Sequence, residues 1–341
     1  MQFSLRRSST SANSRWPKPS GDWPRPVSRF VPSVDRRLMF DRVEDSMFVL
    51  LDGGLSTALE GLGVDTSSEL WTARAAWQNP DDLVAAHRAF VEAGADVVTT
   101  ASYQCDVELL VRAGADLRAA RAVLASTTEL ARRAVDGSKV EVAASLGPFG
   151  ASLADGSEYT GRYSVPWDVV ESFHRRRLEV LIDTGPDLFA VETIPRRDEA
   201  ALLMELLVEY GSPRAWFSFG CASGERTYGG DDLRAAASEI VDYPNLMALG
   251  VNCVAPHVAS EALAVLRAGG GPFIVYPNHG RVWDGKARAW TGDSHAVDET
   301  LVESWLAAGA RFVGGCCGTS PTEIAQLADL RRRRARPSEC T

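Results

Sequence analysis

The sequence has no long apolar run, little cysteine and a deficit of basic charge. Its longest apolar stretch near the start, Met47 to Leu51, is far shorter than the roughly eighteen residues of a membrane-spanning helix, so the sequence does not predict a membrane protein. Six cysteines in 341 residues are too few for a disulfide scaffold, and without a secretory signal we expect free thiols or metal ligands in a reducing cytoplasm. Lys and Arg number 36 against 45 Asp and Glu, a formal charge of -9, which argues against a nucleic-acid partner.

The beginning of the chain differs from the rest in composition. Residues 1–40 hold eight basic and two acidic residues, and repeated prolines interrupt them without a periodic apolar pattern. We expect residues 1–46 to form a disordered, functionless extension that precedes a start at Met39 or Met47. A transit peptide fits the composition loosely, but the prolines would break the amphipathic helix that it requires.

From Met47 onward the sequence repeats one unit, a short β-branched apolar run followed by a longer stretch of helical periodicity. The runs are Phe48 to Leu51, Asp96 to Thr100, Val140 to Ser145, Leu188 to Glu192, Ala215 to Phe219, Ala248 to Asn252, Phe273 to Tyr276, and Phe312 to Gly315. These strand-helix units predict an α/β protein with a closed parallel barrel, the (β/α)8 or TIM barrel, as a single catalytic domain. An open doubly wound sheet is the alternative, but the segment Asp52 to Thr57 lacks the G-x-G-x-x-G phosphate-binding pattern.

Local signals mark the ends of the predicted helices. Asn79 and Pro80 precede one helical apolar face, Gly94 closes it, and the next strand begins at once. Strand-helix units with these end signals extend over residues 47–330, which we predict to form the barrel domain. Residues 331–341 form a predicted Arg-rich tail, whose first arginines suit the negative end of a helix dipole.

Polar residues and thiols follow the predicted strands at their carboxyl ends, where the active site of a TIM barrel forms. They are Asp52, Thr99, Thr100, Tyr103, Glu192, Asn252, Cys253, Asn278, Cys316 and Cys317. The sixth and eighth strands are separated by one strand, so we expect Cys253 to approach the vicinal pair Cys316 and Cys317. Three thiolates with one open position are typical of a catalytic zinc site.

The vicinal cysteines raise a geometric question. Adjacent residues of a regular strand point to opposite faces, so Cys316 and Cys317 can share one ion only where the strand is interrupted. Gly314, Gly315 and Gly318 would allow this, because glycine adopts backbone angles closed to other residues. Spacing alone leaves open a buried thiol pair or a strained vicinal disulfide.

Several short segments carry a combined pattern. They are Leu51-Asp52-Gly53-Gly54, Ala93-Gly94-Ala95-Asp96, Thr100-Ala101-Ser102-Tyr103-Gln104, Gly156-Ser157-Glu158-Tyr159, Glu192-Thr193-Ile194-Pro195, Gly250-Val251-Asn252-Cys253, Tyr276-Pro277-Asn278 and Gly314-Gly315-Cys316-Cys317-Gly318-Thr319. Together they resemble the homocysteine S-methyltransferase family, over about Met47 to Leu330, and look closest to stand-alone bacterial members that use S-methylmethionine. The resemblance implies a TIM barrel in which Cys253, Cys316 and Cys317 hold Zn2+.

The implied reaction is methyl transfer from a sulfonium donor to homocysteine, which yields methionine. The implied partners are homocysteine and S-methylmethionine or S-adenosylmethionine, with no nucleic acid and no membrane. A thiol with a pKa of about 8.5 is mostly protonated at neutral pH, so homocysteine needs a cation such as Zn2+ to react as a thiolate. The alternatives are a methyltransferase that uses betaine or a selenium analogue, and a zinc- and thiol-binding barrel without catalysis.

The resemblance also implies roles for single residues. Glu192 would bind the α-ammonium group of homocysteine, while Asp52, Gly53 and Thr100 would shape the pocket for its amino-acid head. Asn252 would contact the substrate or orient the neighbouring cysteine. Plainer alternatives are a salt bridge between Glu192 and a loop arginine, and a simple turn at Asp52 and Gly53.

Aromatic residues near the strand ends are candidates for binding the donor cation, with simple packing as the alternative. They are Tyr103, Tyr159 and Tyr276, together with Phe149 and Tyr163. The remaining thiols and histidines are weaker candidates. Cys105 and Cys221 could belong to a different ligand trio. His87 and His174 lie on predicted helix faces, where we expect a structural role, and His257 and His279 lie in loops. Among these, His279 would tune donor access, because it follows the seventh strand directly.

Overall fold

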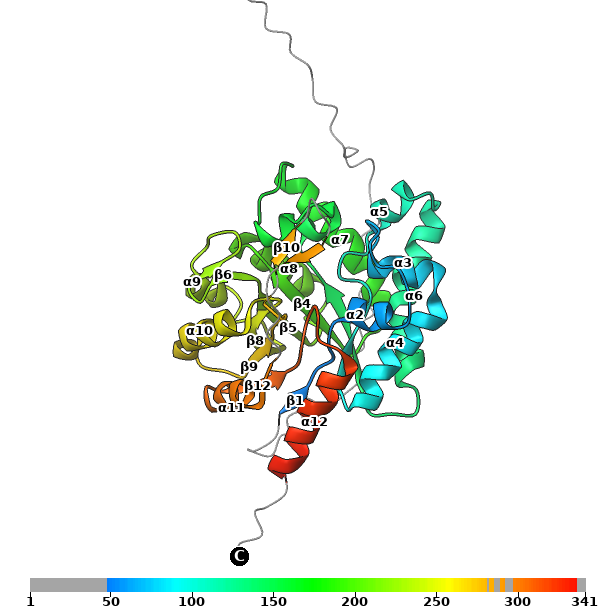
Figure 1. The fold of residues 1–341 in the computed structure, drawn as a ribbon. Helices are drawn as coiled ribbons and strands as arrows, with labels where there is room; N and C mark the ends of the chain where they lie inside the picture. The colour runs from blue at the N-terminus through cyan, green and yellow to red at the C-terminus, as the bar shows by residue number, and fades with distance from the viewer. Residues whose placement is uncertain (1–47, 281, 285–288, 292–296, 336–341) are drawn as a thin grey trace, which may run out of the picture.

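The computed structural model describes residues 48–280, 282–284, 289–291 and 297–335, and its centre is a barrel of parallel strands (Figure 1). The strand order is β1-β12-β9-β8-β5-β4-β3-β2, and a parallel bridge between Leu51 and Val97 joins the two outer members. The strands are β1 (Val49–Leu50), β2 (Val97–Thr99), β3 (Glu141–Leu146), β4 (Leu188–Ile194), β5 (Ala215–Phe219), β8 (Leu246–Asn252), β9 (Phe273–Tyr276) and β12 (Ala310–Val313). All the predicted apolar runs are strands, and the predicted (β/α)8 barrel is confirmed.

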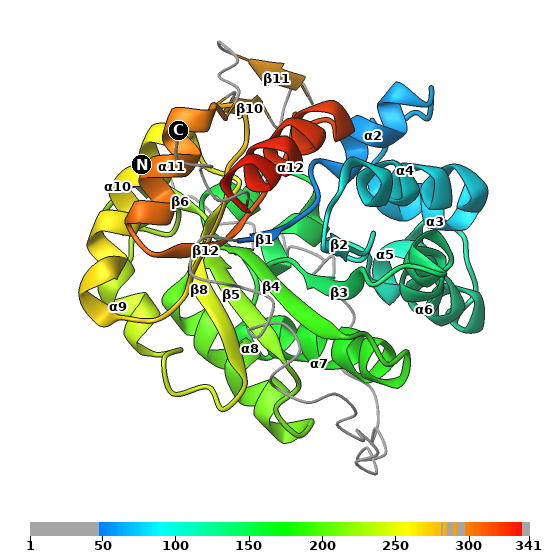
Figure 2. The same cartoon turned by 90° about the horizontal axis from the view of Figure 1, so that it is seen from below.

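Helices surround the strands in a ring, which is clearest in the view along the barrel (Figure 2). They are α2 (Leu55–Gly61), α3 (Thr72–Gln78), α4 (Pro80–Ala93), α5 (Val107–Arg112), α6 (Leu117–Val135), α7 (Trp167–Asp183), α8 (Arg197–Glu209), α9 (Leu233–Ser238), α10 (Pro256–Leu266), α11 (Glu299–Ala307) and α12 (Pro321–Ala335). Short 3-10 turns are η1 (Phe149–Leu153), η2 (Ser157–Tyr159) and η3 (Arg267–Gly269), and two hairpins are β6 (Cys221–Ser223) with β7 (Arg226–Thr227) and β10 (Val282–Asp284) with β11 (Ala289–Thr291). Among the described residues no helix combines the length and apolar character needed to cross a membrane.

The alternation of side chains along the strands separates two apolar cores. Inside the barrel, residues such as Val49, Ala190, Trp216 and Ile274 form one buried cluster. The opposite faces of the strands pack against the helices in a second and larger cluster. The inner cluster fills the floor of the barrel, so the polar residues at the carboxyl ends of the strands stand above an apolar layer.

Helix α4 shows how the local signals operate. It begins at Pro80 and ends at Gly94, whose φ of 101° is in the left-handed region. Asn79 precedes the helix as predicted, but its side-chain amide donates to Asp82 and caps no backbone N–H. The strand β2 starts within a few residues, so the predicted helix-glycine-strand joint is confirmed.

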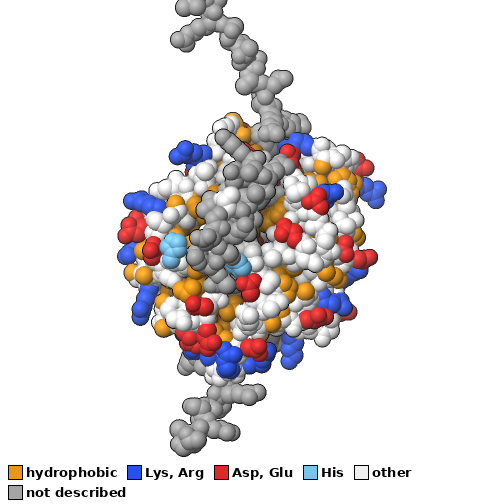
Figure 3. All heavy atoms as spheres, viewed as in Figure 1, with side chains coloured by type: hydrophobic (Ala, Val, Ile, Leu, Met, Phe, Trp, Pro, Cys, Tyr) orange, Lys and Arg blue, Asp and Glu red, His pale blue; other side chains and the backbone are white. Residues whose placement is uncertain are grey.

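The C-terminal arginines belong to the last helix of the barrel. Helix α12 continues to Ala335, and Arg331 donates to the carboxylate of Asp96 and to the carbonyl oxygen of Gly94, 3.1 Å away. The predicted extension of residues 1–46, and the end of the predicted tail with Arg336 and Cys340, lie outside the described residues. On the face seen in Figure 3, acidic and basic side chains are interspersed over the described part of the surface.

Candidate active site

Three cysteines meet at the carboxyl end of the barrel. Cys253 directly follows β8, and Cys316 and Cys317 follow β12. Their sulfur atoms lie within 4.8 Å of one another, with 3.9 Å between Cys253 and Cys317, and all three thiols are free. Sulfurs bound to one tetrahedral zinc are separated by about 3.8 Å, given a Zn–S bond of about 2.3 Å. The predicted approach of the three thiols is confirmed, and the donor set suits Zn2+ with one open position.

The thiols influence one another chemically. Hydrogen bonds with Cys316 and Cys317 hold the pKa of Cys253 well below its ordinary value, although burial acts in the opposite direction. The cluster therefore favours a thiolate at Cys253, the form that binds a metal.

The backbone turns these sulfurs toward one point in an unexpected way. Cys253 itself is in the left-handed region, with φ of 52°, and Gly318 has φ of 91°. Gly314 and Gly315 have no positive φ, so the prediction that they supply unusual angles is wrong. They are needed for space: a Cβ on Gly314 would lie 2.6 Å from the Cβ of Leu51, and one on Gly315 would overlap the side chain of Thr319.

One cavity next to the cysteines contains most of the predicted substrate residues. Its lining includes Asp52, Gly53, Thr100, Tyr103, Tyr159, Glu192, Tyr276, Cys253, Cys316 and Cys317. Thr99, predicted as a polar residue at the carboxyl end of the second strand, also lines this cavity. The sequence interpretation missed other lining residues such as Trp71 and Ser145, and nothing in the pattern distinguished Ser145 from other strand residues.

Glu192 is the buried carboxylate on one side of this cavity. It accepts hydrogen bonds from the hydroxyls of Ser145 and Tyr276, the latter at 3.1 Å. Burial raises its pKa to about 7, against the effect of these two hydrogen bonds. No basic side chain of the described residues forms an ion pair with it, so the alternative of a salt bridge to a loop arginine is wrong for this part of the chain.

Asp52 places a second buried carboxylate in the cavity. One of its oxygens accepts from the backbone N–H of Thr99 at 2.7 Å and from the Thr99 hydroxyl at 3.0 Å. Burial raises the pKa of Asp52 to about 8 despite these bonds. The following Gly53 is more than a turn residue, because an added Cβ would lie 2.6 Å from the carbonyl oxygen of Thr319. The loop after β1 therefore packs directly on the loop after β12.

Asn252 does not reach the cavity. Its side chain is fully buried, its Oδ1 accepts from Thr193 N at 2.7 Å and from Ser218 Oγ at 2.8 Å, and its Nδ2 donates to Thr193 Oγ1 at 2.8 Å. These bonds join the carboxyl ends of β4, β5 and β8. Of the two roles considered for Asn252, the geometry favours orienting Cys253 over contact with a substrate.

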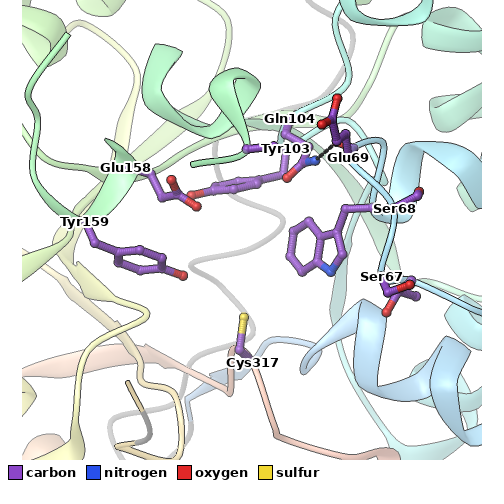
Figure 4. Close-up of a pocket in the computed structure, with 11 residues that line it drawn as sticks. Ser67, Ser68, Glu69, Tyr103, Gln104, Glu158, Tyr159 and Cys317 are labelled. Carbon is purple, nitrogen blue, oxygen red and sulfur yellow. Dashed lines mark hydrogen bonds between the residues drawn. The ribbon is translucent and has the colours of Figure 1, made fainter. Parts of the chain in front are cut away.

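A second cavity adjoins the first at the cysteines. Cys317, Trp71, Tyr103 and Tyr159 line both. Figure 4 shows Tyr103, Glu158 and Tyr159 around this space, with the sulfur of Cys317 pointing into it from below. The Tyr159 hydroxyl lies 3.8 Å from the sulfur of Cys253. Sequence reasoning missed Trp71 and Glu158, although Glu158 stands in the quoted segment Gly156-Ser157-Glu158-Tyr159.

The other aromatic candidates lie elsewhere. Tyr276 is on the floor of the first cavity, where its hydroxyl bonds with Trp216, Ser218 and Glu192. Phe149 is fully buried, and its ring packs edge-on against Tyr163 with 5.3 Å between the ring centres. The prediction that Phe149 and Tyr163 contact a donor is therefore wrong, because they form part of the packing behind the cavity.

Buried polar groups support the loops that carry the cavity walls. The guanidinium of Arg177 is fully buried and donates to the carbonyl oxygens of Ser102 and Tyr103, both at 2.9 Å. Glu199 accepts from Phe149 N and from Tyr163 Oη, both at 2.6 Å, and His174 Nε2 lies 2.9 Å from the same carboxylate. The structural role predicted for His174 is confirmed.

The remaining thiols and histidines lie outside the cluster. Burial raises the pKa of both Cys105 and Cys221 to about 12, and neither is part of the three-cysteine group, so a ligand trio that contains them is wrong for the described residues. His279 Nε2 lies 3.0 Å from a carboxylate oxygen of Glu323, and its ring packs behind Gly318. Neither cavity includes His279 in its lining.

Comparisons with known proteins agree with this site. The family described as Homocysteine S-methyltransferase matches residues 49–331. Homocysteine S-methyltransferase of Escherichia coli (strain K12) is 39% identical over 290 residues, covering 82% of this chain and 94% of the relative. Selenocysteine Se-methyltransferase of Brassica oleracea var. italica is 33% identical over 304 residues, covering 82% of this chain and 88% of the relative.

A solved structure supports the same relationship. The crystal structure of the homocysteine methyltransferase MmuM from Escherichia coli in its metallated form superposes with a TM-score of 0.75 and 36% sequence identity, covering 88% of this chain and all of that chain. The fold, the cysteine cluster and the extent of these matches agree. The chain belongs to the homocysteine S-methyltransferase family and is an enzyme of methyl transfer to homocysteine.

Proposed function

We propose that the protein transfers a methyl group from a sulfonium donor, with S-methylmethionine preferred and S-adenosylmethionine accepted, to the sulfur of homocysteine, giving methionine. The observation that carries the proposal is the meeting of two cavities at the three cysteines. Cys317 lines both, so an acceptor in one cavity and a donor in the other would be adjacent at the metal site. Such positioning of two reactants supplies a large part of the acceleration in a displacement reaction.

The first cavity suits the amino-acid head of homocysteine. Glu192 and Asp52 are buried carboxylates whose raised pKa values indicate that each is poorly compensated without a cation. The α-ammonium group of homocysteine would supply that cation at Glu192. Hydrogen bonds from the hydroxyls of Ser145 and Tyr276 hold the Glu192 carboxylate in a fixed orientation. Asp52, Gly53 and Thr100 line the same cavity.

Cys253, Cys316 and Cys317 would hold a zinc ion. When bound, Zn2+ supplies the positive charge that keeps the sulfur of homocysteine deprotonated near neutral pH. The chain itself keeps the ligands free and close together, and Asn252 anchors the strand end that precedes Cys253 through its bonds with Thr193 and Ser218. A reducing compartment such as the cytoplasm fits this proposal, because oxidised thiols could not bind the metal.

The second cavity suits a cationic donor. Trp71, Tyr103 and Tyr159 present aromatic rings, which attract a sulfonium through their negative faces. Three thiolates around one Zn2+ would leave the metal site with a net negative charge, which favours a cation over a neutral donor. Tyr276 is assigned to the acceptor side, because its hydroxyl bonds with Glu192. A methyltransferase that uses betaine or a selenium analogue remains the alternative.

The test is methionine formation by the purified holoenzyme with homocysteine and each donor in turn. S-methylmethionine should give the highest kcat/KM, S-adenosylmethionine a lower value, and betaine the lowest. A metal-loaded protein that forms no product with any donor would contradict the proposal and favour the zinc- and thiol-binding barrel without catalysis.

Metal analysis tests the ligand set independently of activity. Cys316→Ser should lose most of its zinc, because serine is a poor zinc ligand, whereas Cys221→Ser should keep it, since Cys221 lies outside the cluster. Full zinc retention in Cys316→Ser would contradict the assignment of the three cysteines.

A further inference from the structure

One buried carboxylate of the second cavity has an oxygen atom without a partner among the described residues. Glu158 lies in η2 and is 9% exposed, and its Oε2 atom forms no hydrogen bond with any described residue. Figure 4 shows the carboxylate facing the space between Tyr103 and Tyr159. Among the described residues that line this cavity none is basic, so no side chain of this part of the wall neutralises the charge.

The burial of the Glu158 carboxylate is energetically unfavourable in the absence of a ligand. Burying a carboxylate with one unpaired oxygen and no opposite charge is unfavourable, and burial raises the pKa of Glu158 to about 7, against the effect of a hydrogen bond from its own backbone N–H. Unsatisfied buried groups of this kind are uncommon in folded proteins and are often explained by a missing ligand. The aromatic rings of the same cavity also attract a cation. The carboxylate and the rings together therefore suit a ligand with a positive charge.

The loop around Glu158 is held in one conformation. The backbone N–H of Tyr159 donates to Gly156 O at 3.0 Å, and that of Gly161 donates to Ser157 O at 2.8 Å. Gly150 packs so closely that an added Cβ would lie 2.5 Å from Glu158 N. The carboxylate is therefore presented before a ligand arrives, which reduces the entropy lost on binding.

We infer that Glu158 binds the positively charged group of the methyl donor and selects cationic donors over neutral ones. This inference rests on the proposed function and assigns one residue to the donor side of the site. During transfer the bond between the methyl carbon and the donor sulfur breaks with its electron pair going to that sulfur, while the homocysteine thiolate forms the new bond. A sulfonium donor thus becomes a neutral thioether, so Glu158 binds the donor more tightly than the product where it faces the sulfonium.

The test is the Glu158→Gln holoenzyme, with Glu205→Gln as the matched control. Glu205 is exposed on α8 and lines neither cavity. A hydrogen-bonded charge pair contributes about 1.5–3 kcal/mol, so Glu158→Gln should raise the KM for S-methylmethionine by about 10- to 100-fold. The KM for homocysteine and the zinc content should stay at wild-type values, and Glu205→Gln should change the donor KM by less than about twofold.

A second donor identifies the cationic group. Dimethylsulfonioacetate has the sulfonium but no ammonium group. If its KM rises as much as that of S-methylmethionine, Glu158 faces the sulfonium, and if it does not change, Glu158 faces the ammonium; both outcomes support the inference. Glu158→Asp keeps the charge and should recover part of the affinity, which separates loss of charge from a folding defect.

An unchanged donor KM in a folded, zinc-loaded Glu158→Gln protein would overturn the inference, as would a rise in the homocysteine KM instead. Wild-type protein that forms no methionine with any donor would contradict the proposed function itself. The two failures are therefore distinguishable, since the first requires an active wild-type enzyme.

Discussion

Replacing Asn252 with alanine should loosen the metal site without touching a ligand. The side chain joins Thr193, whose φ is 57°, to the strand end that carries Cys253, whose φ is 52°. Left-handed conformations cost a residue that is not glycine about 1–2 kcal/mol each, and they persist because the surroundings hold them. Asn252 is the group that holds Thr193, through both its backbone N–H and its hydroxyl.

The magnitude follows from the bonds that would be lost. Asn252→Ala leaves Thr193 N buried without a partner, which costs about 1–3 kcal/mol, and it removes two further bonds of about 1 kcal/mol each. We therefore expect the free energy of unfolding to fall by about 3–5 kcal/mol. Outer groups that orient metal ligands typically affect metal affinity by about 10- to 100-fold, and we expect a loss in that range.

Competition with a chelator measures the zinc affinity, and denaturant unfolding measures stability. Ser218→Ala is the control, because it removes one bond to Asn252 and leaves both bonds to Thr193 intact. It should reduce zinc affinity by less than about threefold. A folded Asn252→Ala protein with wild-type zinc affinity would refute the reasoning, since the side chain would then serve packing alone.

Two further predictions concern acid sensitivity and close packing. Burial lowers the pKa of His87 from 6.5 to about 4, so its protonation favours the unfolded state. Its own contribution to the free energy of unfolding should fall by about 3 kcal/mol between pH 6.5 and 4. The difference in unfolding free energy between wild type and His87→Leu, measured by denaturant titration at several pH values, should change by this amount. An equal slope in both proteins would contradict the role of His87. Gly315→Ala should lower both zinc content and melting temperature because its Cβ would overlap Thr319, whereas Gly61→Ala, with open space around it, should change neither.

The barrel could be predicted from the sequence because its signals are local. Each strand is a short apolar run, and glycines such as Gly94 mark where a helix ends before the next strand begins. In a TIM barrel the order of the strands along the chain places Cys253 near Cys316 and Cys317, so the thiol cluster followed from the fold class alone.

The roles of several residues depended on contacts between distant segments. Asn252 and Glu192 both lie near the carboxyl ends of their strands. The side chain of Asn252 forms hydrogen bonds with Thr193 and Ser218, whereas the carboxylate of Glu192 lines a cavity. A sequence pattern contains the position of a polar residue but not the partners that satisfy it, because those partners come from other strands.

By itself the sequence determined the barrel, the strand ends and the approach of the three cysteines, since periodicity and chain order control these features. The tertiary structure alone decided which glycines bend the chain and which make room, as Gly318 and Gly315 illustrate. It also decided that an oxygen atom of the Glu158 carboxylate is buried beside the aromatic rings without a partner among the described residues. The physical reason is that burial and hydrogen-bond satisfaction are properties of the whole packed arrangement and not of any short segment.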